Sequence, residues 1–200
     1  MLSLFPVSSS ENLLPFDGEV YYYPNFFNPS ESQAYLTQLT VEIPWKHDEL
    51  VIFGKVIQTR RKVAWYADHN KSYTYSGRTK VGLSWTPTLL SIKTAIEQKL
   101  KTSFNGCLLN YYHDGDDGAS WHADDEKSIQ VNSHIASISL GATRKFEFKH
   151  KQTQEKISLL LEPGSLLVMK GTTQTHWIHQ LPKSKKIKVP RLNLTFRQMI

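Results

Sequence analysis

The sequence predicts a mainly β domain, a double-stranded β-helix (jelly-roll, cupin-like) barrel that is braced by N-terminal helices. Two observations predict this fold. Helix start signals occur only in the first half of the chain, and short strand-like segments separated by glycine or proline follow residue 106. Helices followed by a run of strands are typical of a barrel with helices on one side. The 200 residues fit one domain.

Two helices are expected before the strands. The first begins at Asn28-Pro29 and is expected to run to about Thr40, because asparagine caps a helix and proline suits its first position. The second begins in the same way at Thr86-Pro87 and is expected to stop at Asn105-Gly106. Its apolar residues recur at helical spacing: Leu89, Ile92, Ile96 and Leu100.

Six strands are expected after the second helix. Each is short, rich in β-branched, aromatic or leucine residues, and ends near glycine or proline. They are Cys107–Tyr112, Ser133–Leu140, Lys145–His150, Ile157–Leu161, Ser165–Met169 and Arg191–Arg197.

The charge of the chain suggests a phosphate-bearing partner. There are 24 basic and 18 acidic residues, a formal net charge of +6. Basic residues gather in Arg60-Arg61-Lys62 and in Lys183–Lys188, and such clusters bind phosphate by releasing counterions. A solvated charge run is an equally good interpretation of both clusters.

The single cysteine, Cys107, cannot form an internal disulfide and suits a reducing compartment. We therefore expect a cytoplasmic protein, or a nuclear one if the source is eukaryotic. Residues 1–10 have few apolar side chains and no basic start, so neither a signal peptide nor a membrane span is expected. We also expect a monomer.

Three side chains are candidate metal ligands: His122, Asp124 and His179. Two imidazoles and one carboxylate occupy one face of ferrous iron and leave positions open for an organic co-substrate and dioxygen. A His-x-Asp triplet alone is a weak signal. His176 is a rival ligand, but on an extended strand His176 and His179 would face opposite sides, and only one could reach the metal. The other histidines are interpreted as surface or satisfied polar residues: His47, His69, His113, His134 and His150.

The last predicted strand strengthens the metal hypothesis. Alternation places Arg191, Asn193, Thr195 and Arg197 on one face and leucine and phenylalanine on the other. An exposed charged face is the ordinary interpretation. Arginine also grips a carboxylate through two parallel hydrogen bonds. Two arginines beside iron therefore favour a dicarboxylate, 2-oxoglutarate.

Six motifs in order resemble the AlkB-type iron(II) and 2-oxoglutarate dependent dioxygenases, most closely the branch that repairs duplex DNA. The resemblance runs from about Ile52 to Arg197. The motifs are Asn110-Tyr111-Tyr112, residues 121–126 (WHADDE), residues 136–144 (ASISLGATR), residues 164–169 (GSLLVM), residues 176–179 (HWIH) and residues 191–197 (RLNLTFR).

The resemblance implies a ligand set and a reaction. His122, Asp124 and His179 would hold iron. The enzyme would remove alkyl groups from 1-methyladenine and 3-methylcytosine in DNA, consuming 2-oxoglutarate and O2 and releasing succinate, CO2 and formaldehyde. The residues implied to bind 2-oxoglutarate are Asn110, Tyr112, Arg191, Asn193 and Arg197.

The resemblance also implies how the base is reached. Ile52, Phe53 and Gly54 resemble an apolar wedge that enters a duplex, and they precede Arg61 at the family's spacing. A hairpin that buries Ile52 and Phe53 in the core is the alternative.

Residues Tyr73, Tyr75 and Ser76 resemble the lid over a flipped base, on which Tyr75 would stack. Trp65 and Tyr66 either line the pocket or pack beneath this lid, and packing is the favoured interpretation.

Asp125 and Glu126 orient the metal ligands, contact the polar edge of the base, or are simple surface acids, and the last is the favoured interpretation.

The chain is expected to divide into four segments of a single domain. These are an N-terminal extension with a short helix (about 1–50), a nucleotide-recognition lid (51–85), a bracing helix (86–105) and a jelly-roll core (106–200).

Three functions remain open on the sequence alone. The first is oxidative demethylation of alkylated DNA, in duplex and single-stranded form. The second is demethylation of RNA or protein at the same iron centre. The third is a non-catalytic barrel that binds nucleic acid through its basic clusters. Loss of turnover without loss of DNA affinity on removal of His122 separates the first two from the third.

Overall fold

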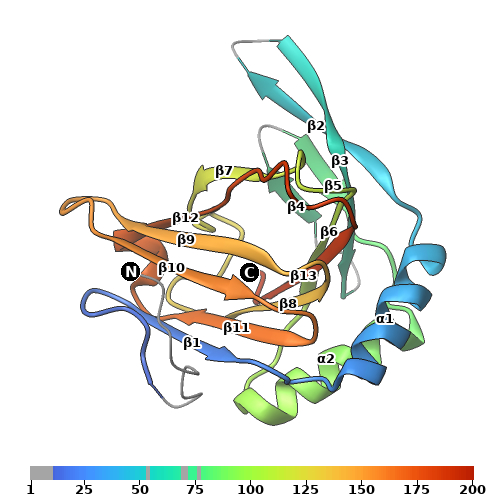
Figure 1. Cartoon of the computed structure of the whole chain (residues 1–200), viewed down its shortest axis with the longest axis horizontal. Coiled ribbons are helices and arrows are strands. Elements are labelled where there is room, and N and C mark those ends of the chain that lie inside the picture. The colour runs from blue at the N-terminus through green and yellow to red at the C-terminus, as the bar shows by residue number, and fades with distance from the viewer. Residues whose placement is uncertain (1–10, 53–54, 69–71, 76–77) are drawn as a thin grey trace.

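The computed structural model describes residues 11–52, 55–68, 72–75 and 78–200. Two larger sheets face each other as a barrel (Figure 1). The seven-stranded sheet has the order β1 (Glu19–Tyr23), β11 (Ser165–Lys170), β8 (Ile135–Gly141), β13 (Arg191–Arg197), β6 (Gly106–Tyr112), β3 (Lys55–Ala67) and β2 (Lys46–Ile52). The four-stranded sheet has the order β10 (Lys156–Leu161), β9 (Arg144–His150), β12 (Trp177–Leu181) and β7 (Ala119–His122). A two-stranded sheet pairs β4 (Ser72–Tyr75) with β5 (Arg78–Val81).

The first helix, α1 (Pro29–Glu42), confirms its prediction. Asn28 accepts a hydrogen bond from the Glu31 backbone N–H at 3.0 Å, and the Glu31 carboxylate accepts one from the Asn28 N–H at 2.9 Å. These reciprocal bonds satisfy two amide groups that a helix start leaves open.

The second helix, α2 (Pro87–Leu100), begins where expected, with the Thr86 hydroxyl accepting from the Leu89 N–H. The expected stop at Asn105-Gly106 is wrong. Lys101 has a left-handed backbone (φ 54°) and donates to the Glu97 carbonyl, which closes the helix without glycine.

Helices α1 and α2 cover the outer face of the seven-stranded sheet (Figure 1). Their apolar residues pack against the outward-facing side chains of β6, β8 and β13, including Leu109, Ile138 and Leu194, all fully buried. The inner face is thereby left for polar side chains. The predicted braced jelly-roll is confirmed.

The six predicted strands are all present within two residues, as β6, β8, β9, β10, β11 and β13. The prediction missed β1, which lies in the segment assigned to an extension and pairs with β11 as an edge strand of the large sheet. Strand β7 was missed as well because it spans only four residues. A short helix, α3 (Thr173–His176), leads directly into β12.

Strands β2 and β3 extend beyond the barrel (Figure 1). Ile52 ends β2 and pairs with Lys55 of β3. Trp65 and Tyr66 near the other end of β3 are 3% and 2% exposed, so both pack in the interior as expected. Among the described residues, no helix combines the length and the apolar character that a membrane crossing requires.

Candidate active site

The three predicted metal ligands meet at one end of the four-stranded sheet. His122 ends β7 and His179 lies in β12, and the two residues are direct partners across the ladder. Asp124 follows β7 by two residues. Their candidate ligand atoms all lie within 4.8 Å of one another, and the two imidazole rings have centroids 4.4 Å apart. Segments more than 50 residues apart in the chain therefore form one compact cluster.

The protonation states suit a divalent metal. Burial disfavours the charged Asp124 carboxylate, but the nearby Arg197 guanidinium outweighs burial and lowers the Asp124 pKa to about 2. Burial, with His122 close by, lowers the His179 pKa to about 3. At neutral pH the cluster thus holds an anionic carboxylate and a neutral imidazole, the forms that bind iron.

Neighbouring groups fix the orientation of these ligands. His122 Nδ1 lies 2.7 Å from the Ser120 carbonyl; since a carbonyl only accepts, Nδ1 carries the proton and Nε2 keeps its lone pair. The Asp124 backbone N–H donates to Gln174 Oε1 at 2.9 Å. Arg197 Nη2 donates to Asp124 Oδ1 at 2.7 Å.

A cavity of about 70 Å³ opens beside this cluster. Strand β13 supplies one wall, because its polar face points inward while Leu192, Leu194 and Phe196 join the core on the other side. The structure thus brings the eight residues predicted to hold iron and 2-oxoglutarate around one space: His122, Asp124, His179, Asn110, Tyr112, Arg191, Asn193 and Arg197.

Arg191 is the side chain best suited to a carboxylate. It is 2% exposed, and Nη2 donates to Ser139 Oγ at 2.8 Å. Burial lowers its pKa to about 10, an effect that nearby Tyr112 partly offsets. In the described part of the chain, Arg191 Nε has no hydrogen-bond partner, nor does Asn110 Oδ1. A buried cation with a spare donor is costly, and a bound dicarboxylate would satisfy it.

Arg197 lines the same cavity, and its guanidinium also contacts the Asp124 carboxylate at 2.7 Å. Asn193 is held by Ser137, to which its Nδ2 donates at 2.7 Å. Among the five residues predicted for 2-oxoglutarate, Arg191 therefore has the clearest free donor.

The residues predicted to contact the substrate do not all line the same cavity. Arg61 lines the iron cavity, where Nη2 donates to Asp48 Oδ2 at 2.9 Å. Asp125 and Glu126 line a neighbouring depression with Lys151 and Gln174. Phe53, Gly54, Ser76 and His69 lie outside the described residues, as do the side chains of Ile52, Tyr73 and Tyr75.

Several residues that support the site were not predicted from the sequence. Asp48 is buried beside Arg61. Arg144 is 1% exposed and donates to three backbone carbonyls, those of Asp114, Asp117 and Pro182. It thereby ties the loop after β6 to the segment after β12. Its place in the 136–144 motif is the only signal that could have drawn attention to it.

His176 does not join the iron cluster. It ends α3 and lies beside His150 and Asp17. The expectation that His176 faces away from the metal is therefore met, although a helical turn and not an extended strand separates it from His179.

Comparison with known proteins agrees with this geometry. Residues 19–197 match the model of the 2OG-Fe(II) oxygenase superfamily. The chain is 37% identical over 189 residues to the DNA oxidative demethylase ALKBH2 of Bos taurus, covering 89% of this chain and 68% of that protein. It is 37% identical over 185 residues to the alpha-ketoglutarate-dependent dioxygenase alkB homolog 3 of Mus musculus, covering 88% and 64%. The solved structure of OsALKBH1 superposes with a TM-score of 0.61 at 16% identity, over 90% of this chain and 97% of that one.

The chain therefore belongs to the 2OG-Fe(II) oxygenase superfamily. It is an oxygenase that uses iron(II) and 2-oxoglutarate, and its relatives confirm the resemblance to AlkB-type enzymes. The donor set of His122, Asp124 and His179, with the spare donor of Arg191, fits both groups.

Proposed function

We propose that this protein is an oxidative demethylase of N-alkylated bases in DNA, with 1-methyladenine and 3-methylcytosine as substrates. The observation that carries the proposal is the single cavity that holds the His122, Asp124 and His179 cluster together with Arg191 and Arg61. The relatives named DNA oxidative demethylase ALKBH2, at 37% identity, support DNA as the substrate.

Different residues of the cavity have different roles in this reaction. When bound, iron, 2-oxoglutarate and dioxygen supply the oxidation, in which the N-methyl group leaves as formaldehyde and 2-oxoglutarate becomes succinate and CO2. His122, Asp124 and His179 hold the metal, and Arg197 keeps Asp124 ionised and oriented. Arg191, whose guanidinium is fixed by Ser139, would bind a carboxylate of 2-oxoglutarate.

The remaining wall of the cavity receives the base. Arg61 lies there, held by Asp48 at 2.9 Å and with its guanidinium carbon 6.0 Å from the centre of the Tyr112 ring. A base in a duplex cannot reach this cavity unless it is flipped out of the stack. We assign Tyr73, Tyr75 and Ser76 to covering the flipped base, and Asp125 and Glu126 to the rim of the site.

We assign phosphate binding to the segment after β12. Lys183, Lys185, Lys186 and Lys188 are exposed, and backbone hydrogen bonds between Ser184, Ile187 and Gly115 hold this segment against the loop after β6. In the other basic cluster, Arg60 is already bound to Asp114 and Arg61 to Asp48. The lysine segment is therefore the better candidate for contacts to the nucleic-acid backbone.

Residues 51–85 are proposed to be the nucleotide-recognition part of a single 200-residue domain. We further propose that the protein acts as a monomer in the cytoplasm, or in the nucleus if the source is eukaryotic.

Formaldehyde release from one methylated sequence, prepared as duplex DNA, single-stranded DNA and RNA, tests this function. We expect release from both DNA forms, dependent on iron, 2-oxoglutarate and oxygen. The His122→Ala variant should lose turnover and keep most of its DNA affinity. A rate on RNA far above the rate on both DNA forms would reassign the substrate.

The Phe53→Ala variant tests the proposed wedge of Ile52, Phe53 and Gly54. A wedge fills the gap left by a flipped base, so turnover should fall more on duplex than on single-stranded DNA. Equal losses of turnover on both substrates would show that Phe53 has a structural role and is not a wedge.

A further inference from the structure

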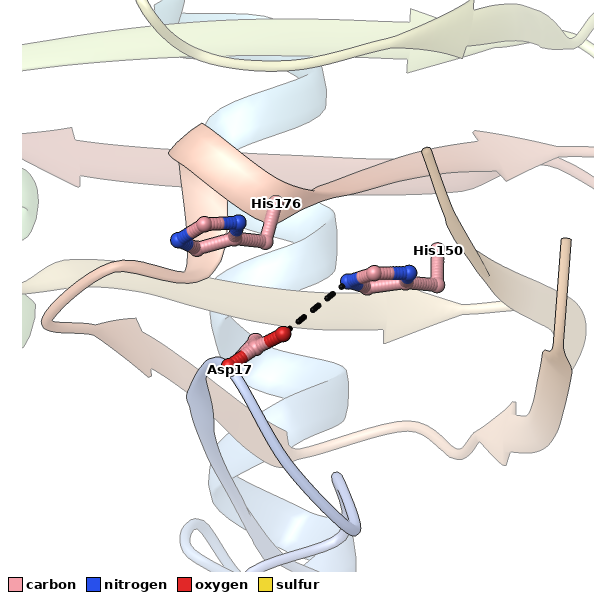
Figure 2. A group of neighbouring side chains, drawn as sticks. All are labelled: Asp17, His150 and His176. Carbon is pink, nitrogen blue, oxygen red and sulfur yellow. Dashed lines mark ion pairs between the residues drawn. The ribbon is translucent and has the colours of Figure 1, made fainter. Parts of the chain in front are cut away.

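A second cluster with the same donor types lies outside the active site. Asp17, His150 and His176 place their candidate ligand atoms within 4.8 Å of one another. Figure 2 shows the three side chains facing one another, from the turn before β1, the end of β9 and the end of α3. On the β9–β12 ladder, His179 pairs with Phe148, and two residues farther along Trp177 pairs with His150. The buried residues Phe148 and Trp177 are thus the ladder partners of His179 and His150, and one rung, Ile178 with Lys149, separates the two pairs.

His150 is the unusual member of this cluster. Its side chain is 1% exposed, yet in the described part of the chain its Nε2 atom has no hydrogen-bond partner. The nearest carboxylate oxygen, Asp17 Oδ2, is 3.4 Å away, without hydrogen-bond geometry. Buried polar atoms in folded proteins nearly always have a partner. His150 Nε2 thus has an ion-pair contact with Asp17 but no hydrogen bond (Figure 2), and a carboxylate and a second imidazole close to it complete a donor set that could hold a metal ion.

The distances suit a tetrahedral ion. Zinc binds imidazole nitrogen and carboxylate oxygen at about 2.0–2.1 Å, so ligand atoms in a tetrahedral site lie about 3.3 Å apart. The separation of 3.4 Å between His150 Nε2 and Asp17 Oδ2 already matches one edge of that tetrahedron. The ring of His176 is nearly parallel to that of His150, at an interplanar angle of 12° with centroids 6.2 Å apart, and its ligand atom lies within 4.8 Å of those of His150 and Asp17.

The surroundings hold His150 in place. Its ring lies edge-on to Phe16 and Trp177, with centroids 5.1 Å and 5.0 Å away, and Trp177 Nε1 donates to the Phe16 carbonyl at 3.1 Å. His176 is anchored through its carbonyl, which accepts from the Lys151 N–H at 2.8 Å. The Asp17 side chain is 52% exposed, which leaves room for water as a fourth ligand.

We propose that Asp17, His150 and His176 form a structural zinc site. Without the ion, His150 Nδ1 accepts from the Thr153 backbone N–H at 3.1 Å, so Nε2 carries the ring proton. The ion displaces that proton from Nε2; Nδ1 then carries the ring proton, gives up its bond from the Thr153 N–H and donates to Thr153 Oγ1, 3.2 Å away, as metal-bound histidines commonly donate their other N–H to oxygen. The ion ties the turn before β1 to β9 and α3. The site is independent of the proposed DNA substrate.

Zinc binding to metal-free protein tests the proposal. The iron cluster also binds zinc, so the His122→Ala variant is used to weaken that site. We expect Zn²⁺ at 100 times its Kd to raise the Tm of His122→Ala by about 5–10 °C. Adding Asp17→Asn or His176→Ala should abolish this rise. By calorimetry the otherwise wild-type protein should bind two equivalents, and the Asp17→Asn and His176→Ala variants one.

His134→Ala is the matched control, because His134 is a half-buried histidine outside both clusters, and it should keep two equivalents. The metal-free Tm of each variant checks folding. No Tm rise of the His122→Ala variant with zinc, or a rise that survives both Asp17→Asn and His176→Ala, would overturn the proposal.

Discussion

Two clusters in this protein carry two imidazoles and one carboxylate, and they differ in what surrounds them. In the cluster of His122, Asp124 and His179, the carboxylate is 5% exposed, bound by Arg197, and placed on a cavity wall. In the cluster of Asp17, His150 and His176, the carboxylate is half exposed and the buried ring is enclosed by Phe16 and Trp177. Donor type alone therefore does not define function. A cavity with a buried arginine makes a site for chemistry, whereas aromatic packing makes a site for holding the fold together.

Removing a ligand of the first cluster should give the largest effect. We expect His179→Ala to lower demethylation by more than about 100-fold, since even changes to groups that only orient a metal ligand cost about 10–100-fold. His134→Ala, outside both clusters, should retain turnover. Formaldehyde release at saturating iron measures both. Turnover of His179→Ala near the wild-type rate would show that this cluster is not required for catalysis.

The Arg191→Lys variant tests whether the cavity binds 2-oxoglutarate through this arginine. Lysine keeps the charge but loses the planar pair of donors that grips a carboxylate. We expect KM for 2-oxoglutarate to rise about 10- to 100-fold, with a smaller change in kcat at saturation. An exchange of Lys185, exposed on the segment after β12, for alanine should leave this KM unchanged. An unchanged KM in Arg191→Lys would place the dicarboxylate elsewhere.

Strand β9 joins the two regions, with Arg144 at its first position and His150 at its last. Arg144→Ala leaves three carbonyls without the charged donor that holds them. We expect a loss of about 3 kcal/mol in the free energy of unfolding and a Tm lower by about 6–12 °C. Thermal unfolding measures it. Ordinary surface substitutions change the Tm by about 2 °C or less. A change no larger than that in Arg144→Ala would show that other contacts hold the loop.

The smallest effect is expected at the surface of the same loop. Hydrogen bonds from Arg60 lower the Asp114 pKa from 3.8 to about 2. A carboxyl with a lowered folded-state pKa stabilises the fold above its ordinary pKa, and that contribution disappears as the pH falls from about 4 towards 2. The Arg60→Ala variant should therefore unfold in acid at a slightly higher pH, an effect kept small by exposure. Unfolding at an unchanged pH would leave the pair without a role in stability.

Local patterns made much of the fold predictable. Asparagine or threonine followed by proline marked both helix starts, because capping depends on neighbours in the chain. The alternation in residues 191–197 assigned each side chain of β13 to the correct face of the sheet. This alternation, together with His122, Asp124 and His179, also predicted the iron cluster from the sequence.

What depends on distant contacts was not predictable. Asp48 acquires its role from Arg61 across the β2–β3 hairpin, and Arg144 from carbonyls on two other segments. His150 was interpreted as a surface or satisfied residue, yet it is buried with a nitrogen that lacks a hydrogen bond within the described chain. Its partner Asp17 is 133 residues earlier, on a turn with φ 52°, and no spacing rule connects them.

The central claim is that His122, Asp124 and His179 hold a metal that binds 2-oxoglutarate together with Arg191. Anaerobic calorimetry of 2-oxoglutarate, with and without Mn²⁺ in place of iron, tests it most directly. We expect 2-oxoglutarate to bind the wild type at least about tenfold more tightly with metal, and metal to have no effect on its binding to the Asp124→Ala variant. Equal binding with and without metal, or an Asp124→Ala variant that responds like the wild type, would contradict it.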